Sequence, residues 1–169
     1  MNEPGSAKRP RGPAVSVDDR AAVEGPDPDS LGELLAAVLA AEGVPRGSEA
    51  GLHFVGVEEM TELNQRAMGE DGPTDVLSFP VDGGAAVDGA LVPHLVGDVV
   101  LCTEVAVRNA ATHAGTVTDE CRLLVVHGGL HLCGWDHSTP RQRDDMWRRE
   151  RELMASLGVS PSGEPWDMT

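Results

Sequence analysis

Aromatic residues are scarce in this sequence, which has no tyrosine, two phenylalanines and three tryptophans among its 169 residues. Platforms on which nucleic-acid bases could stack are therefore scarce as well. Basic residues are outnumbered, because thirteen lysines and arginines stand against twenty-eight acidic residues and the formal net charge is −15. A field of this sign repels nucleic acid and anionic membranes, so any contact with RNA must rest on a local patch.

Cysteines and long apolar segments are also few. Three cysteines without a CxxC pair argue against a disulfide framework and fit a reducing compartment. No stretch approaches the ~20 apolar residues that a membrane span needs, and the N-terminus lacks the apolar segment of a secretory signal. We therefore expect a cytoplasmic protein that has no membrane partner.

The chain length suits a single domain with a hydrophobic core. Residues 1–13 are rich in proline, glycine and charge, and we expect them to form a disordered N-terminal tail. A single catalytic domain is expected over 14–158, followed by a loose C-terminal tail over 159–169. Within the domain, the glycine-rich stretch 81–94 is expected to be an irregular, mobile loop.

Apolar periodicity and turn residues predict the secondary structure. Strands are expected at 14–19, 51–57, 76–80 and 96–102, and helices at 31–43, 58–68, 103–115, 118–134 and 140–157. The expected N-caps are Ser30, Thr103, Thr118 and Thr139. Because strands and helices do not alternate regularly, we expect an α+β fold, with one small mixed sheet of about four strands and about five helices packed against it.

Three histidines lie within the eleven residues HGGLHLCGWDH, at positions 127, 131 and 137. His127 and His131 are four residues apart and share one face of the expected helix. Gly134 suits the end of that helix, where a turn can bring His137 to the same point. Three imidazoles around zinc leave one coordination position for water, which is typical of a catalytic site. Nickel or copper also accepts three imidazoles.

The residue after the first histidine distinguishes this motif from that of zinc peptidases. Those enzymes carry a glutamate there as general base, whereas Gly128 has no side chain. The nearest carboxylate, Asp136, could orient a histidine, cap the turn or act as a base, and these alternatives stay open. Cys133 is interpreted as a small apolar packing residue.

The motif HGGLHLCGWDH closely resembles the H-G-x-L-H-L-x-G-[YW]-D-H signature of the YbeY family. Two further segments, GPTDVLSFP (72–80) and GDVVLC (97–102), resemble stretches of that family in the same order, and the resemblance covers roughly 51–158. It implies a compact α+β domain with a zincin-like metal helix. It also implies that His127, His131 and His137 hold one Zn²⁺ and act in catalysis through metal-bound water.

The resemblance further implies a single-strand-specific, zinc-dependent endoribonuclease of bacteria. Such an enzyme would mature the 3′ end of 16S ribosomal RNA and take part in ribosome biogenesis and quality control. The implied partners are single-stranded RNA, the small ribosomal subunit and its assembly factors, with no DNA among them. The nucleophile stays open, because either a water on the metal or the 2′-OH of the RNA could attack the phosphate.

Substrate contacts are harder to assign. Many family members have an arginine where this sequence has Met68, and Arg66 lies ~200° away around the expected helix and does not replace it. Ser78, Arg141 and Arg143 are the candidate substrate-binding residues. The alternatives are a backbone hydrogen bond for the serine and ion pairs on a solvated helix face for the arginines.

Two other functions remain in competition with the nuclease. One is a zinc hydrolase that cleaves peptide or amide bonds, which Gly128 argues against. The other is a ribosome-associated scaffold whose metal is structural. An open coordination position argues against the scaffold, whereas the missing family arginine favours it.

Overall fold

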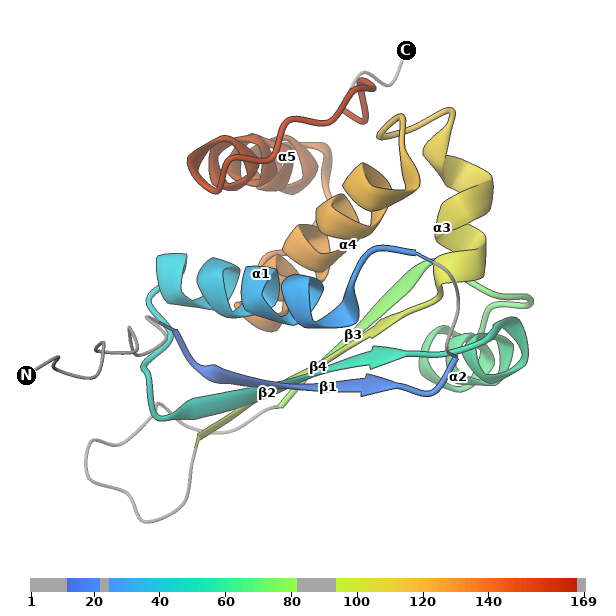
Figure 1. Cartoon of the computed structure of the whole chain (residues 1–169), viewed down its shortest axis with the longest axis horizontal. Coiled ribbons are helices and arrows are strands. Elements are labelled where there is room, and N and C mark those ends of the chain that lie inside the picture. The colour runs from blue at the N-terminus through green and yellow to red at the C-terminus, as the bar shows by residue number, and fades with distance from the viewer. Residues whose placement is uncertain (1–11, 22–24, 82–93, 167–169) are drawn as a thin grey trace, which may run out of the picture.

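A four-stranded sheet in the order β1-β2-β4-β3 forms one layer of the computed structural model, which describes residues 12–21, 25–81 and 94–166 (Figure 1). Its elements, in chain order, are β1 (Ala14–Asp19), α1 (Pro28–Ala41), β2 (Ser48–Phe54), α2 (Val57–Met68), β3 (Val76–Pro80), β4 (His94–Leu101), α3 (Thr103–Ala110), α4 (Val117–Leu132) and α5 (Pro140–Ser156). The predicted α+β class, with a small mixed sheet and five helices among the described residues, is confirmed. The tail 1–11 and most of the expected loop, 82–93, lie outside the described residues.

The sheet is mixed because one edge strand runs against the others. β1 pairs with β2, and β2 with β4, in parallel, whereas β3 pairs with β4 antiparallel. β2 begins three residues earlier than predicted and ends at Phe54. β4 begins at His94, two residues before its predicted start. Among the described residues, no helix is both long enough and apolar enough to cross a membrane.

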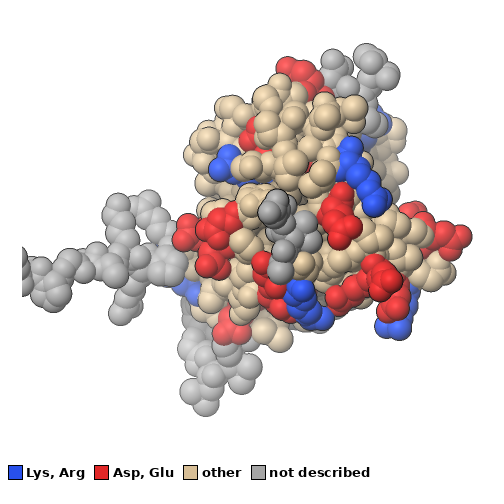
Figure 2. Space-filling model, turned by 45° about the vertical axis from the view of Figure 1, so that its right-hand side comes forward, with Lys and Arg blue, Asp and Glu red and all other residues tan. Residues whose placement is uncertain are grey.

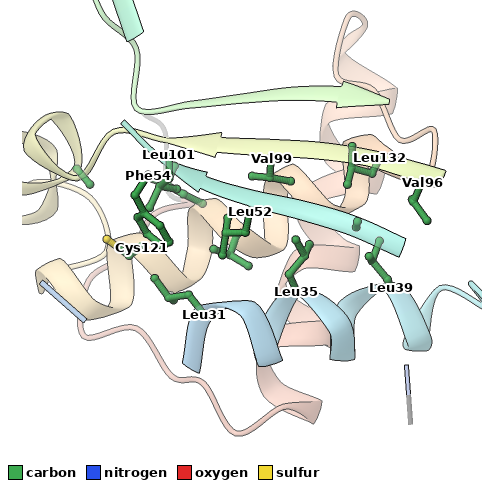
Figure 3. Packing of buried hydrophobic residues seen from close by; sticks show 14 residues of the cluster. Leu31, Leu35, Leu39, Leu52, Phe54, Val96, Val99, Leu101, Cys121 and Leu132 are labelled. Carbon is green, nitrogen blue, oxygen red and sulfur yellow. The ribbon is translucent and has the colours of Figure 1, made fainter. Parts of the chain in front are cut away.

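The core lies between the sheet and the helices α1 and α4, which cover the same face of it (Figure 1). Figure 3 shows the leucines of α1 pointing toward the apolar side chains of the strands. The labelled members of this cluster are Leu31, Leu35, Leu39, Leu52, Phe54, Val96, Val99, Leu101, Cys121 and Leu132. α4 also contacts α3 and α5, so it is surrounded by other elements on most sides.

Two consecutive glycines let α4 approach both of its neighbours closely. A Cβ atom built on Gly128 would lie 2.8 Å from Val99 Cγ1 of β4. A Cβ atom on Gly129 would lie 2.9 Å from Val38 Cγ1 and 3.0 Å from Leu35 Cδ1 of α1. Such distances are well inside ordinary van der Waals contact, so α4 fits between the sheet and α1 because both side chains are absent.

Of the four predicted N-caps, three differ from those in the structure, and the fourth, Thr139, is confirmed. α1 begins after Asp27, whose side chain accepts the backbone N–H two residues on, so Ser30 is not the N-cap. α4 is capped by Thr116 rather than Thr118. Asp, Ser and Thr recur at short intervals near both helix starts, so several residues could serve as N-cap. The residue that does so is the one directly followed by a continuous helical backbone.

The third difference is at α3, where Thr103 lies inside the helix and Cys102 is the N-cap, with no side-chain hydrogen bond. α3 also ends at Ala110, five residues before the predicted end. At α5, the predicted capping box is confirmed: Thr139 Oγ1 accepts Gln142 N–H, and the Gln142 side chain accepts Thr139 N–H.

Residues 159–166, which were expected to belong to a loose tail, contact the domain at several points. Val159 is 7% exposed and belongs to a cluster between α4 and α5. Gly163 N–H donates to Ala114 C=O at 2.8 Å, and Trp166 Nε1–H donates to Glu150 Oε2 at 2.9 Å. A buried apolar residue and two hydrogen bonds to the domain anchor this segment, although its composition suggested none of them.

Candidate metal centre

The three histidines of the motif converge. His127 and His131 lie on the last turns of α4, and His137 follows the turn after it. The Nε2 atoms of His127 and His131 are 3.0 Å apart, and one ring nitrogen from each of the three histidines lies within 4.8 Å of the others. Two rings are half-buried and the His137 ring is exposed, so the group has an open side. Three such imidazoles could hold a metal ion.

The turn after α4 positions both His137 and His131. Gly134 has a φ of +93°, which glycine adopts without the steric cost that a Cβ brings. Trp135 N–H donates to Leu130 C=O, and Trp135 C=O lies 2.8 Å from His131 Nδ1. Because Nδ1 donates to this carbonyl, Nε2 is left free to bind a metal.

The charge state of His131 suits a ligand. Burial lowers the pKa of His131, and the neighbouring His127 lowers it further. A depressed pKa favours the neutral imidazole, the form that binds metals. Trp135 Nε1–H donates to Glu42 Oε2 at 2.9 Å, which fastens the turn to the end of α1.

Glu150 of α5 orients the other helical histidine, and sequence reasoning missed it. Its Oε1 lies 2.5 Å from His127 Nδ1, and the carboxylate is 3% exposed. A carboxylate behind a metal-binding imidazole fixes the ring and its tautomer. The signal was present: Glu150 lies on the apolar stripe of α5, four residues after Met146 and three before Leu153, both buried.

Asp136 makes its hydrogen bonds to the turn. Its side chain accepts His137 N–H at 2.8 Å and the Ser138 hydroxyl at 2.5 Å. The hydroxyl hydrogen bond, with the backbone one, holds the pKa of Asp136 below its ordinary value. Of the three roles considered for Asp136 from the sequence, these contacts support capping of the turn.

Ser78 of β3 contacts α4. Its hydroxyl donates to Gly128 C=O at 3.1 Å, and a Cβ on Gly128 would lie 3.2 Å from Ser78 Oγ. Ser78 and Val99 together fill the space that a side chain at position 128 would need. The position at which peptidases carry their glutamate is therefore a packing contact in this fold.

The two candidate arginines form ion pairs on α5. Arg143 contacts Asp144 at 3.2 Å, and its guanidinium lies 5.0 Å from the Trp147 ring centroid. Arg141 lies 4.0 Å from Asp145, and its side chain is 94% exposed. Met68, in the place of the family arginine, is 61% exposed at the end of α2.

Two cavities flank the histidines. One of about 300 Å³ is formed by the turn Cys133–Asp136 with Gln142 and Asp145. The other, of about 200 Å³, has aromatic walls from Trp147 and Trp166. Its remaining lining residues are Asp75, Val76, His113, Leu123, Leu124, His127, Glu150 and Pro165. On the face shown in Figure 2, acidic side chains form clusters with few basic ones between them.

The fold and the site define a class, an α+β domain in which three histidines that could hold a metal ion converge at the end of a helix. A family model described as "Endoribonuclease YbeY" matches residues 25–158. A protein of that name from Salinispora tropica is 44% identical over 121 residues, which cover 68% of this chain and 77% of the relative. Another, from Parafrankia sp., is 38% identical over 148 residues, covering 85% and 93%. The chain belongs to the Endoribonuclease YbeY family.

A solved structure agrees on the fold. The solution structure of TM1509 from Thermotoga maritima is similar to this chain, with a TM-score of 0.51 and 24% sequence identity. The similarity covers 89% of this chain and 99% of the other. The arrangement of helices and strands described above is therefore shared across distant sequences.

Proposed function

We propose that the protein is a zinc-dependent endoribonuclease that cuts single-stranded RNA and processes the 3′ end of 16S ribosomal RNA. The observation that carries the proposal is the convergence of three imidazoles within 4.8 Å, in a chain whose family is described as endoribonuclease. One Zn²⁺ per chain is the proposed metal, because neutral imidazoles suit it and three of them leave a coordination position open. When bound, such an ion supplies a Lewis acid at the phosphodiester.

The residues around the histidines keep the site ready for the metal. Glu150 holds the Nδ1 side of His127, and the Trp135 carbonyl holds the Nδ1 side of His131. Both rings therefore present Nε2 to the same point. This preorganisation supports rapid reaction, because the ligands need no rearrangement when the substrate arrives.

The cavity beside His127 supports a single-stranded substrate. Its volume of about 200 Å³ can receive one nucleobase, and Trp147 and Trp166 offer surfaces on which a base could stack. A base in a duplex stays paired and stacked, and extruding it costs a few kcal/mol. We infer that unpaired RNA is cut in preference to duplex RNA.

Affinity for free RNA is expected to be modest. The net charge of −15 opposes phosphate binding, and Arg143 is already paired with Asp144. Arg141 is the better candidate for a phosphate contact, because its ion pair with Asp145 is long and exposed and therefore contributes little free energy. We propose that the small ribosomal subunit and its assembly factors present the RNA, that this takes place in the cytoplasm, and that DNA is not a substrate.

Cleavage of peptide or amide bonds is less well supported. Gly128 has no room for the glutamate of the peptidase motif, since Val99 and Ser78 occupy that space. Among the described residues, the carboxylate that is hydrogen-bonded to a ring of the three histidines is Glu150, and its partner is His127. A buried, paired carboxylate of this kind orients a ligand and does not collect protons from a substrate.

A substrate comparison tests the proposal. Zinc-loaded protein is incubated with a single-stranded oligonucleotide that spans the 3′ end of 16S ribosomal RNA, with the same RNA as a duplex, with the matching DNA, and with a peptide panel. His131→Ala is the inactive variant, and His53→Ala is the matched control because His53 pairs with Asp98 on the sheet. We expect cleavage of the single strand alone, lost only in His131→Ala. Peptide cleavage, or RNA cleavage that survives in His131→Ala, would contradict the proposal.

A further inference from the structure

Glu150 stands between a histidine of the metal centre and the C-terminal segment. It is one of the few charged side chains that are buried, at 3% exposure. Its Oε1 accepts from His127 Nδ1, and its Oε2 accepts from Trp166 Nε1 at 2.9 Å. A buried carboxylate is stable only when its oxygens are hydrogen-bonded. With both oxygens engaged, its orientation is fixed, and so is that of the imidazole that it contacts.

The segment 159–166 is fastened to the domain before it reaches Glu150. Gly163 N–H donates to Ala114 C=O, and a Cβ on Gly163 would lie 2.2 Å from His113 C=O. A Cβ on Gly115 would lie 2.3 Å from Ser162 Oγ. The two glycines therefore permit a close fit between this segment and the turn that precedes α4.

The ring of Trp166 contacts an arginine through one of its faces. The Arg151 guanidinium lies 5.7 Å from the Trp166 ring centroid, which is within the range of a cation–π contact. Pro165 is buried next to it. The backbone contacts and the guanidinium on one face of the ring therefore hold Trp166 so that its indole N–H points at the Glu150 carboxylate.

We propose that Trp166 is a positioning residue of the metal centre, acting through Glu150 on His127. The proposal rests on the proposed binding of zinc by the three histidines, and it extends that site to the last described residue of the chain. Without the indole N–H, Glu150 Oε2 is left buried and without a hydrogen-bond partner, which is unfavourable for a charged oxygen. The carboxylate then leaves its position, and His127 loses the partner that orients it.

The test measures zinc affinity in the absence of RNA. Trp166→Phe removes the N–H and keeps an aromatic ring against Arg151. Trp147→Phe is the matched control, because Trp147 lines the same cavity and its indole makes no hydrogen bond within the described part of the chain. By competition with a chromogenic chelator, we expect Trp166→Phe to weaken zinc binding by about tenfold and Trp147→Phe to leave it unchanged.

A second pair of variants separates positioning from a general loss of structure. Glu150→Gln keeps the shape of the side chain and is expected to weaken zinc binding by about 10–100-fold. If Trp166 acts through Glu150, adding Trp166→Phe to Glu150→Gln weakens binding no further. The visible spectrum of cobalt-substituted protein should change in Trp166→Phe and stay unchanged in Trp147→Phe, because it reports the arrangement of the ligands.

Three outcomes would overturn the inference. One is unchanged zinc affinity in Trp166→Phe, and another is an effect of Trp166→Phe that is equally large in the Glu150→Gln background. The third is a wild type that binds no metal at the histidines, which would also end the proposed function. A wild type that binds zinc with the expected Trp166 dependence but cuts no RNA would contradict the nuclease proposal alone.

Discussion

Replacement of Gly128 by alanine should destabilise the protein, although alanine is the better helix former. Gly128 lies inside α4, where the exchange gains about 1 kcal/mol of helix propensity. Against this gain stands a new Cβ at 2.8 Å from Val99 Cγ1 and 3.2 Å from Val99 Cγ2 and Ser78 Oγ. Val99 is fully buried on β4, between β2 and β3, and a β-branched side chain there has little freedom to turn away.

The net effect follows from the two magnitudes. Overpacking of a well-packed core costs about 1–3 kcal/mol, which exceeds the propensity gain of about 1 kcal/mol. We therefore expect Gly128→Ala to lower the free energy of unfolding by about 1 kcal/mol, which corresponds to a melting temperature about 2–4 °C lower for a chain of this length. Gly128→Glu, the peptidase residue, should disrupt packing far more and confer no peptidase activity.

Urea unfolding with a chelator present measures this effect without a contribution from bound metal. The double variant Gly128→Ala, Val99→Ala provides the control, since truncation of Val99 removes the closest contact. In the Val99→Ala background, Gly128→Ala should become neutral or stabilising, by up to about 1 kcal/mol. An increase in stability on Gly128→Ala in the wild-type background would refute the claim that close packing excludes a side chain at this position.

Two further predictions concern the three cysteines and the start of α5. Burial raises the pKa of Cys121 to about 12, that of Cys133 to about 11 and that of Cys102 above its ordinary value, so all three thiols stay protonated near about pH 8. A thiol reagent should therefore label the native protein slowly and label all three cysteines after unfolding. Fast labelling of Cys121 in the native protein would contradict its burial. Thr139→Ala removes the capping box with Gln142 at the start of α5 and should lower the free energy of unfolding by about 1 kcal/mol in urea titrations; an unchanged midpoint would show that the cap contributes nothing.

Short-range patterns explain which parts of the structure could be read from the sequence. His127 and His131 share a helix face because their spacing is fixed by helical geometry, and Gly134 marks the turn that returns His137. Thr139 was identified as an N-cap for the same reason, since its partner is only three residues away. Each of these features depends on residues close together in the chain.

Contacts between distant segments could not be predicted in the same way. The apolar stripe of α5 can suggest that Glu150 is buried, but its partner His127 is set only by the packing of α5 on α4. Trp166 lies in a segment whose composition suggests a loose tail, and its role depends on the fit of Gly163 against Ala114. The close contact of Gly128 with Val99 likewise requires the fold to be known.

The central claim is that a metal ion held by His127, His131 and His137 enables RNA cleavage. The most direct measurement is a zinc titration of chelator-treated protein, followed by the initial rate of cleavage of a single-stranded ribosomal RNA oligonucleotide. We predict that the wild-type rate rises linearly with added zinc until one ion per chain is bound, and that His131→Ala stays inactive throughout. Full cleavage before any zinc is added, or equal cleavage by His131→Ala, would contradict the account.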